Sequence, residues 1–151
     1  MKSLIIIQVI ITFLAGLTAL FLMYKIMNYF MKKKFKIEEA NSAFAILQVG
    51  ILISTSFIMA SVMSAAVNAV QFLNTGGSVQ LNNVLTSLIY IIVFIVIGML
   101  FTFAVIFSSI FIFFQLTNIN EWEQIKLNNI PTSLISAALI MGLTLIMDDY
   151  I

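Results

Sequence analysis

The sequence predicts an all-α integral membrane protein with four transmembrane helices, arranged as two parallel two-helix repeats. Three observations support this prediction. The 151-residue chain is 62% hydrophobic and 9% charged, whereas about a quarter of the residues in a soluble domain are charged. Its apolar residues gather in four long stretches separated by short polar breaks. The segments that lead into the second and fourth stretches resemble each other.

Each apolar stretch is long enough to cross a bilayer. The stretches run from Leu4 to Tyr24, from Ala43 to Phe72, from Val84 to Phe114 and from Pro131 to Met147. About 20 apolar residues cross the hydrocarbon core, and lipid offers backbone amides no hydrogen-bond partner, so we expect each stretch to be helical. We expect one membrane domain over residues 1–151, with half-repeats of about 1–73 and 84–151.

The first stretch has two interpretations. Met1-Lys2-Ser3 before an apolar run is typical of a signal peptide. However, the run is longer than the apolar region of a signal peptide, no clear small-residue cleavage site follows it, and most lysines come after it. We therefore expect a retained first helix.

The break before the fourth stretch has local structure of its own. Asn120 to Glu123 has the form of a capping box, an Asn N-cap with an acid three residues later. We expect a short interfacial helix from Trp122 to Ile130, with Trp122 at headgroup depth. Pro131, the only proline, is expected in the first turn of the fourth span, where no amide is needed.

The lysines predict the orientation. Six of the seven lie in the first and third breaks, on one side of a four-span protein: Lys25, Lys32, Lys33, Lys34, Lys36 and Lys126. Cytoplasmic loops carry such an excess of lysine, so both termini are expected outside the cytoplasm. The cluster Lys32 to Lys36 attracts anionic lipid headgroups or, alternatively, forms a docking patch for an acidic partner.

The two halves share an Asn-led entry into their second span. Ile37 to Ala45 precedes one and Ile125 to Ser133 precedes the other, with Asn41 and Asn129 in register. This pattern resembles a bacterial inner-membrane family catalogued as domain of unknown function 350. Its Asn-Xaa-Ala-Xaa-Ala stretch and following glycine correspond to Asn41, Ala43, Ala45 and Gly50. The second copy keeps Asn129, but Pro131 and Ser133 replace the alanines. The resemblance implies a multi-pass protein of the bacterial inner membrane and no established chemistry.

A polar stripe marks the second span. Its residues share one helical face by their spacing: Ser54, Ser61, Ser64, Asn68 and Gln71. One interpretation is close packing of helices, in which small residues let backbones approach and amides bond across. The other is a wet, uncharged lining of a pore or cavity, because polar groups at membrane depth must face something polar.

Composition excludes several functions. The chain has no cysteine and no histidine, which removes disulfides, the usual zinc and haem ligands and the commonest general base. We expect Glu38, Glu39, Glu121 and Glu123 to be solvated loop charges or helix caps instead of a catalytic pair. A net charge of +1 gives no field to recruit nucleic acid. We expect no enzyme, cofactor or metal.

The small and polar residues of spans two and four exceed what one four-helix chain obviously uses. We therefore expect a non-enzymatic membrane subunit that self-associates, or scaffolds a membrane complex, through these faces. A passive pore lined by the stripe of span two is the alternative. The expected partners are the lipid bilayer and further copies of the chain or subunits of a membrane complex.

Overall fold

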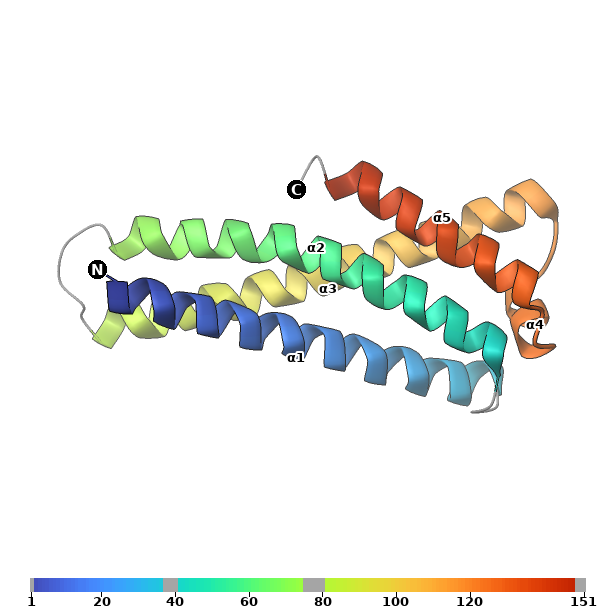
Figure 1. Cartoon of the computed structure of the whole chain (residues 1–151), viewed down its shortest axis with the longest axis horizontal. Helices are drawn as coiled ribbons and strands as arrows, with labels where there is room; N and C mark the ends of the chain where they lie inside the picture. The colour runs from blue at the N-terminus through green and yellow to red at the C-terminus, as the bar shows by residue number, and fades with distance from the viewer. Residues whose placement is uncertain (1, 37–40, 75–80, 149–151) are drawn as a thin grey trace.

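The computed structural model describes residues 2–36, 41–74 and 81–148. Five α-helices follow one another: α1 (Lys2–Phe35), α2 (Ser42–Asn74), α3 (Leu81–Thr117), α4 (Glu121–Lys126) and α5 (Ile130–Asp148). They form an elongated bundle (Figure 1), and the described part of the chain is all-helical, as predicted.

Four helices are long and apolar enough to cross a membrane. Their candidate spans are Phe13–Phe30, Ser42–Val70, Thr86–Thr117 and Ile130–Met147. The chain is therefore a multi-pass membrane protein with four candidate spans, which confirms the predicted number. The expected turn after Asn74 lies in residues 75–80, outside the described part.

The first helix is longer than predicted. We expected the lysines after Tyr24 to occupy a break, but α1 continues to Phe35 and carries Lys25 and Lys32 on its helical surface. Lysine is a good helix former, and its long stem lies along apolar surface while its ammonium group reaches water. Hydropathy falls at these residues, but the helix does not end there.

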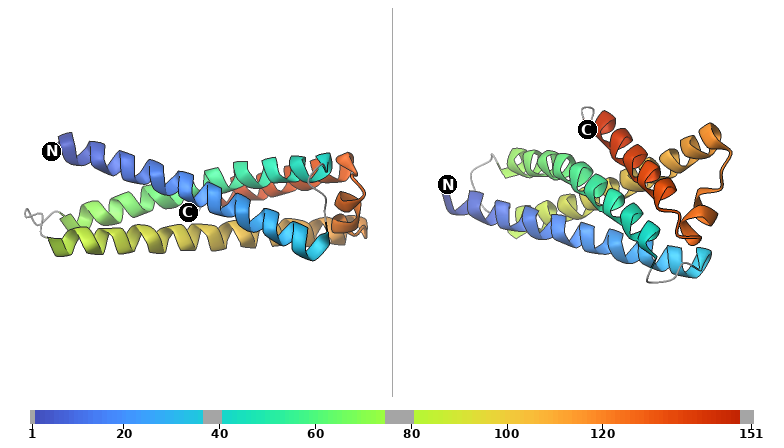
Figure 2. Two further views of the ribbon diagram at one scale, coloured as in Figure 1. Left: turned by 90° about the horizontal axis from the view of Figure 1, so that it is seen from below. Right: turned by 45° about the vertical axis from the view of Figure 1, so that its right-hand side comes forward.

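The bundle has two distinct ends. At one, which we call the lysine end, α1 ends and α2 and α5 begin; both views of Figure 2 place α4 there. The 19 residues of α5 are far fewer than the 33 of α2 and the 37 of α3. Consequently α5 lies beside α2 only from the lysine end and ends well short of the opposite end (Figure 1). The farther part of α2 has no α5 beside it.

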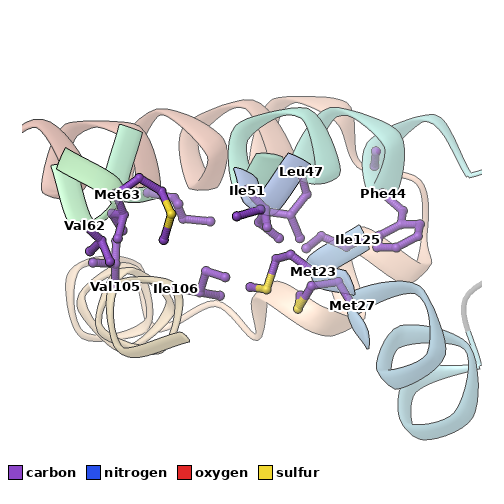
Figure 3. Packing of buried hydrophobic residues seen from close by; sticks show 14 residues of the cluster. Met23, Met27, Phe44, Leu47, Ile51, Val62, Met63, Val105, Ile106 and Ile125 are labelled. Atoms are coloured by element: carbon purple, nitrogen blue, oxygen red, sulfur yellow. The ribbon is translucent and has the colours of Figure 1, made fainter. Parts of the chain in front are cut away.

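The second span is the central helix. Half of its window Ser42–Val70 is buried, against 22% of the windows on α1 and α3. It contacts α1, α3 and α5. Figure 3 shows the apolar core near the lysine end, where Leu47 and Ile51 of α2 meet Met23 of α1, Ile106 of α3 and Ile125 of α4. By contrast, α3 exposes apolar side chains on several sides, including Leu100 and Phe111, as expected for a helix that contacts lipid.

The short helix α4 differs in detail from the prediction. Asn120 is its N-cap with extended backbone angles, but the Asn120 side chain makes no capping hydrogen bond. The helix covers only Glu121–Lys126, and Trp122 is half-buried against the core. Pro131 is the second residue of α5, within its first turn, as predicted.

Candidate functional site at the junction of α2, α4 and α5

Asn41 joins the start of α2 to α4. Its Oδ1 accepts a hydrogen bond from the Phe44 amide at 2.8 Å, which caps α2. Its Nδ2 donates to the carbonyl oxygen of Ile125 at 2.6 Å and reaches that of Lys126 at 3.4 Å. Asn41 is 8% exposed, so these bonds lie in a largely dry environment. One side chain thus satisfies a free amide of α2 and a terminal carbonyl of α4.

Two asparagines after α4 complete the junction. Asn128 has a φ of 60°, in the left-handed region that Asn tolerates, and its Oδ1 accepts from the Ala43 amide at 2.9 Å. Asn129 caps α5, because its Oδ1 accepts from the Thr132 amide at 3.3 Å. The Asn129 Nδ2 donates to Gln124 Oε1 at 2.7 Å. The in-register pair, Asn41 and Asn129, therefore performs the same local task on α2 and α5.

Gly50 marks the closest approach of α2 and α5. A Cβ built on Gly50 would lie 2.7 Å from the Cβ and 2.9 Å from the Cα of Ala137. Real Cβ atoms do not approach so closely, so only glycine fits at this crossing. Of the family-like motif, Asn41, Ala43 and Gly50 are buried, whereas Ala45 is exposed. Three of its four positions therefore serve the internal junction.

Glu121 is buried in this junction, which corrects the expectation of a solvated loop charge. The residue is only 2% exposed, and neither carboxylate oxygen has a hydrogen-bond partner. Burial raises the pKa of Glu121 above its ordinary value of 4.5, while the nearby Ser136 hydroxyl lowers it less. That hydroxyl donates its one proton to the Thr132 carbonyl at 2.9 Å, so it leaves the carboxylate without a hydrogen-bond donor in this arrangement.

The helices that pack most closely on Glu121 and α4 bring no cation. These helices are α2, α3 and α5, and the one cation of α4 itself, Lys126, is exposed. None of their sequences contains a lysine or arginine. The buried α5 face supplies hydroxyls instead, including Ser133, whose Oγ is buried without a partner. A carboxyl group in such a setting favours its neutral, protonated form.

The structure divides the polar stripe of the second span. Ser54 is fully buried, Ser61 is half-buried, and Ser64 and Asn68 are exposed. The side chain of Gln71 lies outside the described residues. The stripe is therefore not one uniform surface in the single chain, because its lysine-end part packs inside and its farther part faces outward.

The expected surplus of small residues on the fourth span is mostly consumed within the chain. Ser133, Ser136 and Ala137 are buried, and Ala137 faces Gly50. Ala138 remains exposed. Span four therefore offers a second copy less small-residue surface than its sequence suggests.

The lysine patch is spread over the last turns of α1. Lys33 donates to the Tyr29 hydroxyl at 2.7 Å and lies 5.1 Å from the centroid of that ring. Lys32 and Lys36 are exposed, and the Lys34 side chain lies outside the described residues. Glu38 and Glu39 also lie outside them, in residues 37–40.

Sequence reasoning missed the burial of Glu121 and the role of Asn128. A signal for the first was available, because Glu121 and Ile125 are four residues apart and share one face of α4. Both are buried. No comparable pattern indicates Asn128, whose bond to the Ala43 amide joins residues 85 positions apart.

Comparison with known proteins identifies one protein family whose sequence pattern this chain matches. A family model described as Domain of Unknown Function (DUF350) matches residues 1–147. No curated protein and no solved structure matches the chain.

Proposed function

The chain belongs to the DUF350 family, and we propose that it is a non-enzymatic integral membrane subunit that self-associates, or joins a larger membrane complex, through the outer α2 face. We define this face as Ala60, Ser64 and Asn68. All three are exposed in the single chain. The main support for this proposal is that these small and polar residues lie within the candidate span Ser42–Val70 yet face outward.

The spacing of the outer α2 face suits helix packing. Ala60, Ser64 and Asn68 recur every four residues, so they form one ridge along the helix. Small residues at this spacing let two helix backbones approach closely, and a hydrogen bond across the contact contributes about 0.6 to 2 kcal/mol. Lipid tails offer neither the Asn68 amide nor the Ser64 hydroxyl a partner. A second copy or another subunit would supply one.

The position of the outer α2 face along the bundle also supports the proposal. Near the lysine end, α2 packs its small residues against α5, with Gly50 facing Ala137. Beyond the point where α5 ends, α2 has no such neighbour (Figure 1). A helix from another chain can pack against this part of α2. It would meet small residues there, as α5 does nearer the lysine end.

Other exposed surfaces suit lipid better. The exposed side chains of α1 and α3 are mainly large and apolar, for example Phe13, Phe21, Ile92 and Leu100. Such side chains gain little from leaving lipid for another helix, because lipid tails are as apolar as they are. The outer α2 face therefore differs in kind from its surroundings.

A passive pore is the second candidate function. Its supporting observation is that exposed Ser64 and Asn68 are uncharged polar groups in a candidate span. Several copies arranged around an axis would bring these groups onto one shared lining. Hydroxyls and amides without charge would give poor ion selectivity. Reconstituted protein would then conduct in planar bilayers and Asn68→Leu would change the conductance, whereas silence at all voltages with an intact oligomer removes the pore.

The proposal also covers chemistry and topology. The absence of histidine and cysteine from the sequence supports a non-enzymatic role. We propose two parallel two-helix repeats, because Asn41 and Asn129 cap α2 and α5 alike and both helices begin at the lysine end. The family resemblance supports a bacterial inner membrane, and the lysine bias supports an orientation with both termini outside the cytoplasm.

Mass measurement in nanodiscs and in mild detergent tests self-association. The wild-type chain is expected as an oligomer or as part of a larger particle. Ser64→Leu and Asn68→Leu should shift it toward the monomer, since a leucine fills the small-residue ridge and removes the polar group. Ile53→Leu is the matched control, because Ile53 is exposed on the same helix but outside this face. A strictly monomeric wild-type particle under several conditions contradicts the proposal.

A further inference from the structure

A polar pocket lies between α1 and α2 at the lysine end, apart from the outer α2 face. Its volume is about 260 Å³. From α1 it is lined by Tyr24, Asn28 and Lys32, which recur every four residues and so share one helical face. From the other side it is lined mainly by Asn41, which caps α2, and by Phe44 and Gln48 of α2. This pocket plays no part in the proposed self-association.

The lining favours an anion. Lys32 supplies a cationic ammonium group, Tyr24 a hydroxyl, and Asn28 and Gln48 amide groups. Among the described residues that line the pocket, none is an aspartate or glutamate whose charge would repel an anion. Asn41 is committed to the fold, because its side chain caps α2 and bonds to α4. The donors that face a ligand are therefore those of the other polar residues.

One of these donors is unsatisfied. Gln48 Nε2 is buried and has no hydrogen-bond partner. A buried donor without a partner is costly, so an acceptor that enters the pocket relieves this penalty. The unpaired Gln48 amide distinguishes the pocket from a surface cluster of lysines. Lysines on a surface attract anions by charge alone, without a buried hydrogen-bond donor.

Lys32 is the cation of this pocket, which it lines together with Gln48. A compact ammonium group beside several amide donors matches an anion that offers multiple oxygens, and phosphate is the common biological example.

Depth and size indicate where the phosphate comes from. Lys32 lies two residues beyond the candidate span Phe13–Phe30, while Tyr24 and Asn28 lie inside it. The pocket therefore sits where the apolar span gives way to the polar headgroup layer. A volume of about 260 Å³ lies just below the usual range of drug-sized ligand pockets, about 300–1,000 Å³. It suits a headgroup more than a large soluble ligand.

We propose that the α1–α2 pocket binds the phosphate group of an anionic phospholipid from the adjoining leaflet. Lys32 provides the opposite charge and Gln48 Nε2 donates a hydrogen bond to a phosphate oxygen. This inference is independent of self-association, because its residues lie on α1 and on the lysine-end part of α2.

Native mass spectrometry of the full chain tests the proposal, with phosphatidylglycerol as the probe and phosphatidylcholine as the uncharged comparison. Lys32→Met should weaken retention of phosphatidylglycerol about tenfold, and Lys33→Met should change it less than about twofold. These two variants lose the same charge at adjacent positions. Equal losses in both variants would mean diffuse surface attraction and would overturn the pocket.

Gln48 variants separate the hydrogen bond from the charge. Gln48→Leu removes the donor without changing any charge, and Gln48→Glu adds a repelling charge at almost constant size. Both should weaken retention, with Gln48→Glu the stronger, and circular dichroism should show that each variant keeps its helices. Unchanged retention in both folded variants contradicts the proposal.

A competition experiment distinguishes a phospholipid from a soluble phosphate ester as the ligand. Glycerol phosphate, added to protein in an uncharged detergent, should compete weakly because it lacks the acyl chains that hold a lipid beside α1. Tight binding of glycerol phosphate, lost in Lys32→Met and Gln48→Leu but kept in Lys33→Met, would overturn the lipid source and assign the pocket to a soluble phosphate ester.

Discussion

The Nδ2 atom of Asn41 lies 2.6 Å from the carbonyl oxygen of Ile125, although 84 positions separate the two residues in the chain. This bond ties the start of the central helix to the short helix α4. The same asparagine caps α2 through its Oδ1. The lysine end is therefore ordered by one side chain that serves two helices at once.

Asn41→Asp separates these two tasks. Aspartate keeps an oxygen that caps α2, but it loses the donor to Ile125 and places a carboxylate beside two carbonyl oxygens. We expect Asn41→Asp to lower the free energy of unfolding by about 1–3 kcal/mol, and Asn41→Ala to lower it further because the cap is also lost. Thermal unfolding in detergent measures both. An Asn41→Asp variant as stable as wild type would mean that the bond to α4 contributes nothing.

Gly50→Ala tests the contact between α2 and α5. The new Cβ would lie 2.7 Å from the Cβ of Ala137, so the helices must separate. We expect a loss of about 1–3 kcal/mol, as in other overpacked interiors. Adding Ala137→Gly should restore part of this loss. Gly16→Ala is the matched control, because nothing lies within 4 Å of a Cβ at Gly16 and alanine favours the helix. Equal effects of Gly50→Ala and Gly16→Ala would contradict the close crossing.

Glu121→Gln tests the buried carboxyl group. Because burial raises its pKa in the folded chain, the folded state binds the proton more tightly than the unfolded state does. The free energy of unfolding should therefore fall as pH rises from the ordinary value of 4.5 through the raised folded-state pKa, and this loss is absent below 4.5.

Glu121→Gln should remove that slope and stabilise the chain near neutral pH by about 1–3 kcal/mol. Melting temperatures over a pH series measure this effect. Glu123→Gln is the matched control, since Glu123 is exposed on the same helix. If both variants keep the wild-type slope, Glu121 is not the group responsible.

Much of the fold is predictable from sequence because few backbone conformations are stable in lipid. A long apolar stretch in lipid must satisfy its own backbone, so helices follow from length and hydropathy alone. The end of α1 was not predictable in this way. The residues from Lys25 to Phe35 are as compatible with a helix as with a polar loop, and only the structure shows that the helix continues.

The junction was less predictable, because it depends on contacts between distant segments. The family resemblance indicated Asn41 and Gly50, but their partners, Ile125 and Ala137, come from another part of the chain. Two acids in a six-residue helix suggest a solvated surface. The burial of Glu121 arises only when α4 packs against α5.

Labelling of single cysteines tests the proposed orientation. The chain has no native cysteine, so every signal comes from the introduced one. An impermeant thiol reagent applied to intact spheroplasts should label Ser78→Cys and not Ser42→Cys, because lysine bias places Ser42 on the cytoplasmic side. Labelling of Ser42→Cys alone would invert the orientation, and labelling of both would mean that the number of crossings is wrong.

The central claim is that copies of the chain, or the chain and another subunit, meet at the outer α2 face. Oxidative cross-linking of Ser64→Cys in native membranes tests the contact between copies most directly, because a disulfide requires Cα atoms within about 7 Å. Ser108→Cys is the control, since Ser108 is an exposed serine on α3. The account predicts a covalent dimer for Ser64→Cys, abolished by adding Asn68→Leu, and little dimer for Ser108→Cys. Equal dimer yields from the two cysteines, or none from Ser64→Cys in a chain of oligomeric mass, would contradict contact between copies at this face.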